Sequence, residues 1–347
     1  MEDEALKDKN LPLVTICIPA YNHERYVGQT IQSVVDQTYE NIELIIINDG
    51  SIDKTDEIIR KYIPECEKRF VRFEYINREN KGLCATLNEA VDWAKGKYFS
   101  PIASDDVLLK DKISVLVDKL ESLDDSYAAA FGNAIFIDDE GKELYLDRKT
   151  GLPTSKEKGF NLFLDYYVSN RDFDYKDASL FGSYKTLLAG NYLPAMSCVI
   201  KLENIREVGA WTEGNTIEDW EMWLKLSKKY KFAYVDKPVA LYRWHTTNST
   251  KLIAKNIHYD AINLLKKEKK IALENNLKQV FYMSLVNYIV GIRNYSYTDF
   301  IIEILKNIYD INFTITFLNK LLKKLKKSPR IRKRETHSLE FKAKVIF

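Results

Sequence analysis

Short apolar runs alternate with helical stripes along the first third of the chain, and this alternation constrains the fold more than any other feature. The apolar runs cover residues 13–19, 42–48, 71–76 and 97–102, and apolar residues at helical spacing fall between them, at 27–35, 54–62 and 83–94. Strands that alternate with helices are typical of a parallel sheet with crossover helices. We therefore predict an α/β fold that binds its ligands at the carboxyl ends of the strands.

After residue 102 this alternation loosens. Strand-like runs at 128–137, 197–201, 232–235 and 239–244 are separated by irregular stretches. One of these, 151–177, has no clear period and is expected to be a mobile loop with short helices. The pattern is helical from Ala254 onward. We predict one domain at 1–250 and a helical C-terminal extension at 251–347.

Composition excludes several classes of protein. The 347 residues suffice for a large core, and the formal net charge is only +2. The four cysteines lie far apart, without the spacing of zinc sites, so we expect reduced thiols in a cytoplasmic protein. The N-terminus lacks a signal-peptide pattern, and no apolar run reaches the roughly 18 residues of a membrane span. These features predict a soluble or peripheral protein.

The loops after the first two predicted strands carry side chains suited to a nucleotide. Tyr21 could stack on a pyrimidine, Asp49 could accept its imide N–H, and Gly50 would let the backbone approach a ligand. Lys81, at the entry to a later helix, could offset phosphate charge. Taken alone, these residues are explained more simply as a turn, a helix cap and a solvated lysine.

Asp105 and Asp106 follow the fourth predicted strand, at the end of the sheet where ligands bind. Carboxylate oxygens suit Mg²⁺ or Mn²⁺, and a bound diphosphate would supply further ligands, so one or two protein carboxylates suffice. The alternative is a helix cap or turn before Leu108. The position at the strand end favours the metal site.

Glu218 and Asp219 occupy the first turn of a predicted helix in which Trp220 and Trp223 share one face. Compensation of the helix dipole is one explanation of the two acids. The same dipole would keep a carboxylate ionised, as a general base for a sugar hydroxyl requires. Further on, His245 is one of only four histidines and could complete a metal site, although a single histidine is more often an ordinary surface or core residue.

Five segments together resemble a known family. They are Val-Thr-Ile-Cys-Ile-Pro-Ala-Tyr-Asn at 14–22, Asp-Gly-Ser at 49–51, Ala-Ser-Asp-Asp at 103–106, Glu-Asp-Trp at 218–220 and Tyr-Arg-Trp-His at 242–245. In this order they are similar to the inverting family 2 glycosyltransferases with the GT-A fold, of the type that assembles bacterial polysaccharide, O-antigen and capsule. The resemblance covers roughly residues 12–250. Many members carry an aspartate where this chain has Ala103, which leaves open whether Asp105 or Asp106 is the principal metal ligand.

The resemblance implies an inverting hexosyltransferase that uses a UDP-sugar donor and Mn²⁺ or Mg²⁺. Its base would be Asp219, next to Glu218, and its metal ligands would come from Asp105, Asp106 and His245. Together with the arguments from single residues, it leads us to expect a donor site that comprises Pro19, Ala20, Tyr21, Asn22, Asp49, Gly50, Lys81 and Asp105.

The expected reaction is a single displacement in which Asp219 takes the acceptor proton and the hydroxyl attacks the anomeric carbon with inversion. A catalytically silent, nucleotide-sugar-binding scaffold of an assembly complex is the alternative, to which Ala103 gives slight support. A sugar nucleotidyltransferase fits less well, because the first loop lacks the glycine-rich, basic pattern of that class.

The C-terminal segment 320–334 is almost entirely basic or apolar. Helical stripes at 301–308 and 318–325 and the accompanying lysines predict contact with an anionic membrane surface, on the inner face of the cytoplasmic membrane. A merely solvated tail is an equally good interpretation. No aromatic stacking platform interleaves these charges, so we do not expect nucleic acid as a partner. The expected acceptor is a saccharide, lipid-linked if the resemblance holds.

Overall fold

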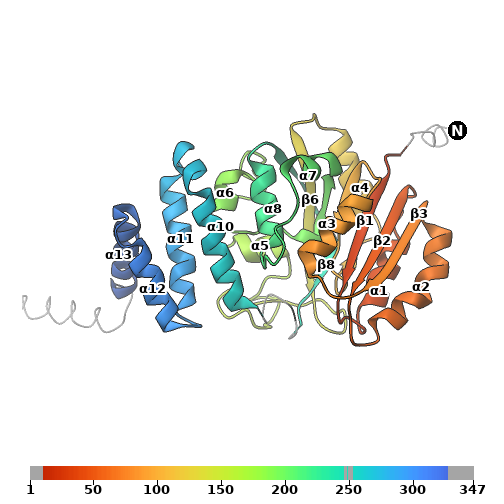
Figure 1. Ribbon diagram of the computed structural model, residues 1–347, viewed down its shortest axis with the longest axis horizontal. Helices are drawn as coiled ribbons and strands as arrows, with labels where there is room; N and C mark the ends of the chain where they lie inside the picture. The colour runs from red at the N-terminus through yellow and green to blue at the C-terminus, as the bar shows by residue number, and fades with distance from the viewer. Residues whose placement is uncertain (1–10, 246–247, 249–252, 327–347) are drawn as a thin grey trace, which may run out of the picture. The chain divides into compact units, whose positions relative to one another are not determined.

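The computed structural model describes residues 11–245, 248 and 253–326. The chain forms two compact units, Met1–Ile253 and Ala254–Phe347 (Figure 1).

The first unit is built on one sheet of eight strands in the order β3-β2-β1-β4-β7-β6-β8-β5. Parallel pairs join β1 to β2 and β4, β2 to β3, and β6 to β8, whereas β7 runs antiparallel to β4 and β6, and β5 antiparallel to β8. This confirms the predicted α/β fold, with a sheet that is mixed and mainly parallel. The strands are β1 (Val14–Ala20), β2 (Ile42–Asp49), β3 (Arg72–Arg78), β4 (Tyr98–Pro101), β5 (Val107–Leu108), β6 (Tyr127–Ile137), β7 (Cys198–Lys201) and β8 (Lys231–Arg243).

Helices flank this sheet (Figure 1). The interior strand β1 is almost wholly buried, and the apolar face of the following helix, with Val27, Ile31 and Val34, packs into the same hydrophobic cluster. The helices of the first unit are α1 (Val27–Val35), α2 (Thr55–Arg69), α3 (Leu83–Trp93), α4 (Lys112–Glu121), α5 (Phe163–Val168), α6 (Tyr184–Leu188), α7 (Leu202–Val208) and α8 (Glu218–Ser227), with a 3-10 turn η1 (Ala195–Ser197).

Three details differ from the pattern in the sequence. The runs 232–235 and 239–244 belong to one strand, β8, whose register against β6 shifts near Pro238, where the apolar pattern is interrupted. The helix expected to end at residue 62 continues past Pro64 to Arg69. Strand β5 was not expected, because two apolar residues are too few to show a period.

The second unit is helical, as the sequence pattern indicates. Within the described part of the chain, none of its helices or those of the first unit combines the length and apolar character needed to cross a bilayer. The helices are α10 (Ala254–Glu274), α11 (Lys278–Ile292), α12 (Tyr297–Asn307) and α13 (Ile311–Lys326).

Candidate functional site

The loops after β1 and β2 are joined by hydrogen bonds at the carboxyl ends of these strands. The backbone N–H of Asn22 donates to Ser51 Oγ at 2.9 Å, and the side chain of Asn22 accepts from the N–H of Ile52 at 2.9 Å. Just before them, Pro19 and Ala20 end β1, opposite the last residues of β2. The two predicted nucleotide loops therefore form one continuous edge, from which the ring of Tyr21 is half exposed.

Asp49 anchors a second part of this edge. Its carboxylate accepts N–H bonds from Lys81 at 2.8 Å and Gly82 at 2.9 Å, and it also pairs with the Arg78 guanidinium. Because each carboxylate oxygen has two lone pairs, one acceptor position remains on Oδ2. The ammonium group of Lys81 lies 4.0 Å from Glu89 and is largely solvated.

Gly50 makes this arrangement possible. Its φ is +74°, and a Cβ at this position would lie 2.6 Å from the backbone nitrogen of Asn80. Any other residue would therefore have to displace the chain that carries Lys81.

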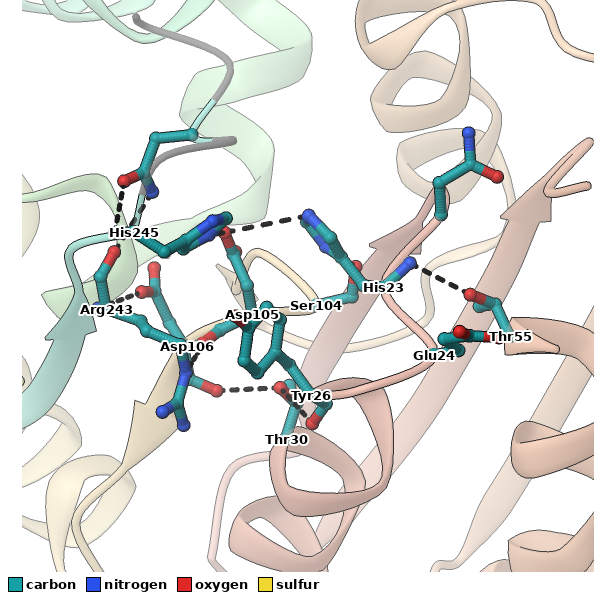
Figure 2. A network of polar contacts seen from close by, with 12 residues as sticks. His23, Glu24, Tyr26, Thr30, Thr55, Ser104, Asp105, Asp106, Arg243 and His245 are labelled. Atoms are coloured by element: carbon teal, nitrogen blue, oxygen red, sulfur yellow. Dashed lines mark hydrogen bonds and ion pairs between the residues drawn. The ribbon is translucent and has the colours of Figure 1, made fainter. Parts of the chain in front are cut away.

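Three donor groups converge beside these loops, as Figure 2 shows for His23, Asp105 and His245. His23 comes from the loop after β1, Asp105 from the loop between β4 and β5, and His245 from just beyond β8. His245 Nε2 lies 2.9 Å from Asp105 Oδ2, and His23 Nε2 lies 3.7 Å from the same oxygen. One ligand atom from each residue falls within 4.8 Å of the other two, so together they could hold a metal ion.

Asp106 makes different contacts. Its carboxylate accepts the N–H of Arg243 at 2.9 Å, and its carbonyl accepts the hydroxyl of Thr30 at 2.7 Å. Arg243, itself 1% exposed, also donates from Nε to the carbonyl of Asp105 at 2.8 Å. Asp106 thus connects the Asp-Asp turn to β8 and α1, while Asp105 faces the two imidazoles.

The two acids also differ in their electrostatics. Burial would raise the pKa of Asp105, but the hydrogen bond from His245 and the charges of the two imidazoles lower it below its usual value. Burial and the neighbouring Asp105 raise the pKa of Asp106 well above its usual value. Burial lowers the pKa of His23, which favours the neutral imidazole that a metal ion requires. The lowered pKa keeps Asp105 ionised, as a metal-binding carboxylate must be.

Glu218 and Asp219 begin α8, as predicted. Asp219 accepts a hydrogen bond from Asn191 Nδ2 at 2.6 Å and another from the N–H of Trp220 at 2.6 Å. The indole of Trp220 donates to the carbonyl of Leu187 at 2.8 Å, which ties the start of α8 to α6. These contacts fix the orientation of the Asp219 carboxylate.

The helix dipole was expected to keep these two carboxylates ionised, but the pKa of each is raised instead. Burial, with repulsion from Asp219, raises the pKa of Glu218 to about 8. Burial also raises the pKa of Asp219 to about 6, against the hydrogen bonds from Trp220 and Asn191 that lower it. Desolvation therefore outweighs stabilisation by the helix N-terminus, and the pair holds a proton near neutral pH.

Sequence reasoning missed three residues of this arrangement. His23 directly follows the predicted loop 19–22 and is one of four histidines, which was a usable signal. Arg243 precedes His245 by two residues, the spacing of one strand face. Asn191 gave no signal, because its bond to Asp219 depends on the path of an irregular segment.

A family model described as glycosyl transferase family 2 matches residues 15–181. An uncharacterized glycosyltransferase of Rickettsia felis is 29% identical over 267 residues, which are 75% of this chain and 39% of that protein. The chain thus spans about two fifths of that relative's length. An uncharacterized glycosyltransferase of Rickettsia prowazekii is 27% identical over 343 residues, covering 91% of this chain and 98% of that protein.

Two solved structures share the fold. S. aureus TarS 1–349, in complex with UDP-GlcNAc, has a TM-score of 0.56 at 14% identity and covers 82% of this chain and 74% of its own. The mannosyltransferase PcManGT from Pyrobaculum calidifontis, in complex with GDP-Man and Mn²⁺, has a TM-score of 0.53 at 12% identity. The match covers 88% of this chain and 83% of that protein's chain. The matched family model, the glycosyltransferase relatives and the shared GT-A fold support assignment of this chain to the family 2 glycosyltransferases.

Proposed function

We propose that the chain transfers a sugar, with inversion, from a UDP-sugar to a hydroxyl of a saccharide acceptor. The convergence of Asp105 with His23 and His245 beside the nucleotide loops carries this proposal. The cluster would hold a metal ion at the donor diphosphate, and α8 would supply the base, a carboxylate whose pKa is raised to about 6.

On the donor side, Tyr21 would stack on the base and Asp49 would accept the imide N–H of uracil at its remaining lone pair. The bonds of Asp49 to Arg78, Lys81 and Gly82 hold that carboxylate in place before the donor arrives. One related fold is known with UDP-GlcNAc and another with GDP-Man, so the donor panel should contain both nucleotides.

The side chains of the three-residue cluster are suitable ligands for a divalent metal ion. Asp105 supplies a carboxylate oxygen and His245 an imidazole nitrogen, and both are strongly buried. Such an ion would neutralise charge that develops on the departing diphosphate. Asp106 would keep the Asp-Asp turn in place through Arg243 and Thr30.

Asp219 would accept the proton of the attacking hydroxyl, since it is held by Asn191 and the helix start. Burial and repulsion from Asp219 raise the pKa of Glu218, so the pair would carry one negative charge near neutral pH, and we assign this charge to Asp219.

We expect Asp219→Asn to remove nearly all transfer, by about a hundredfold or more, because the amide cannot accept the proton. Binding of UDP, measured by calorimetry, should stay within a few-fold of the parent. Comparable transfer by mutant and parent would show that Asp219 is not the base.

The direct test of the activity is release of UDP or GDP from a panel of nucleotide sugars with Mn²⁺, Mg²⁺ or EDTA. We expect metal-dependent release from one UDP-sugar and its loss in Asp105→Ala. Asp106→Ala should lose release together with thermal stability. No release across the panel, with no nucleotide binding, would favour the scaffold instead.

The setting of the reaction is also part of the proposal. We place the enzyme in the cytoplasm, in polysaccharide assembly, with a lipid-linked acceptor brought close by contact of the second unit with an anionic membrane surface. Helix α13 supports this, since Ile311, Ile315, Leu318 and Leu322 form an exposed stripe at helical spacing. The basic residues 327–334 that were expected to take part lie outside the described residues.

A further inference from the structure

His23 is the member of the three-residue cluster that the family resemblance does not name. Its Nε2 points toward Asp105 Oδ2 at 3.7 Å, and its ring meets that of His245 edge to face, with centroids 6.1 Å apart. The His23 side chain is 21% exposed, whereas that of His245 is 1% exposed. His23 therefore forms the open side of the three-residue cluster (Figure 2).

The structure holds the His23 imidazole in one orientation. Its Nδ1 is hydrogen-bonded to Ser104 Oγ at 2.8 Å, which leaves Nε2 directed at the cluster. Its backbone N–H donates to Thr55 Oγ1 at 2.9 Å and so fastens the loop to the start of α2. A hydrogen bond to the second ring nitrogen is the usual support of a metal-ligating histidine, because it fixes the tautomer and the ring plane.

We propose that His23 is a third protein ligand of the metal ion, and that this makes the site selective for a first-row transition ion such as Mn²⁺ over Mg²⁺. The inference deepens the proposed function and rests on it. Two imidazoles and one carboxylate are a borderline donor set, whereas Mg²⁺ binds oxygen almost exclusively and gives up water reluctantly. Three protein ligands would leave other coordination positions of the metal ion for diphosphate oxygens and water.

The competing explanation is that His23 only supports Asp105 through a hydrogen bond. Metal affinity alone would not separate the two roles, since loss of an outer partner also weakens binding about 10- to 100-fold. The number of nitrogens bound to the metal does separate them. Electron spin echo spectroscopy of bound Mn²⁺ detects coordinated imidazole nitrogen directly.

The experiment titrates the 347-residue chain with Mn²⁺, with and without UDP, and follows binding by electron paramagnetic resonance. We expect the parent to bind one Mn²⁺ with two coupled imidazoles and to retain it against a hundredfold excess of Mg²⁺. His23→Ala should lose one nitrogen coupling and at least tenfold in affinity. His23→Asp should recover affinity but allow Mg²⁺ to compete, because it exchanges nitrogen for oxygen. Circular dichroism establishes that each variant is folded.

His258 provides the matched control, because it is a described histidine of the second unit whose Nδ1 is bonded to the carbonyl of Ala254. His258→Gln should bind Mn²⁺ like the parent. Three results would each overturn the inference. They are two nitrogen couplings in His23→Ala, equal competition by Mg²⁺ in the parent, and no Mn²⁺ binding by the parent at about 1 mM. Sugar transfer is measured separately. If the parent releases nucleotide but His23→Ala keeps both nitrogen couplings, His23 is not a metal ligand and the proposed function still holds.

Discussion

At the scale of single residues, the burial of Asp219 has a consequence for the pH dependence of transfer. Its pKa is raised to about 6, so the carboxyl is protonated below that pH and cannot accept the hydroxyl proton. The pH profile of kcat/KM for transfer should therefore have an acid limb: below about pH 6 we expect kcat/KM to fall about tenfold per pH unit. Mn²⁺ binding measured over the same range separates this limb from protonation of the histidines.

A change at Asn191 tests the assignment of that limb. The amide of Asn191 donates to Asp219 and stabilises the ionised form, so Asn191→Ala should move the acid limb to higher pH. The rate well above the limb should change less than the rate at pH 6. A limb that stays in place would assign it to another group.

Gly50 offers a stability prediction with a close control. Gly50 and Gly209 both have positive φ, +74° and +90°, but only at Gly50 would a new Cβ meet backbone, at 2.6 Å. Gly209→Ala should therefore cost only backbone strain, about 1 to 3 kcal/mol for a residue with a φ of +90° and a ψ of +161°. Gly50→Ala should lower the free energy of unfolding by at least about 1 kcal/mol more, because the chain must shift. Urea unfolding measures both, and equal losses would contradict the steric argument.

The residues of the site could be predicted from the sequence only where chemistry and strand ends coincide. Asp105 and Asp49 follow apolar runs, so their position at the sheet edge was predictable. The bonds of Asn191 and Arg243 link segments 28 and 138 positions away, and no local pattern encodes such pairings. The raised pKa of Asp219 was missed for the same reason, since desolvation depends on the tertiary packing.

At the scale of elements, the apolar pattern predicted most strands and helices, because β1 and β2 are buried on both faces and helices such as α1 bury one face. It was least informative where a residue interrupts the pattern without ending the element. Pro238 divided β8 into two apparent strands, yet the strand continues with a shifted register against β6. Similarly, the helix predicted at 54–62 continues through Pro64 to Arg69 as α2. Packing against neighbouring elements decides such cases.

Helix α13 carries the prediction for membrane contact. Ile311 and Ile315 are 70% and 52% exposed and lie one turn apart. Replacing both by serine should reduce binding to phosphatidylglycerol vesicles at least tenfold, because the apolar area that would enter the bilayer is lost. Val71→Ser with Leu152→Ser, at 61% and 62% exposure in the first unit, is the matched control and should bind as the parent does. Equal binding by both double variants would contradict membrane contact through α13.

At the scale of the whole molecule, chemistry and membrane contact are assigned to different units. The sheet, its hydrophobic cluster and all described residues of the candidate site lie within Met1–Ile253. The exposed stripe of α13 lies within Ala254–Phe347. Each unit has its own buried core, which is the physical condition for folding separately.

A chain ending at Ile253 should therefore unfold cooperatively and release UDP from the donor within about tenfold of the full-length rate, while vesicle binding is lost. The Ile311→Ser/Ile315→Ser variant is the control, since it keeps the second unit and removes only the apolar stripe. If the shortened chain loses donor hydrolysis while this control retains it, the second unit must support the site itself. If both retain hydrolysis but fail to use a lipid-linked acceptor in vesicles, membrane contact serves delivery of the acceptor rather than the chemical step.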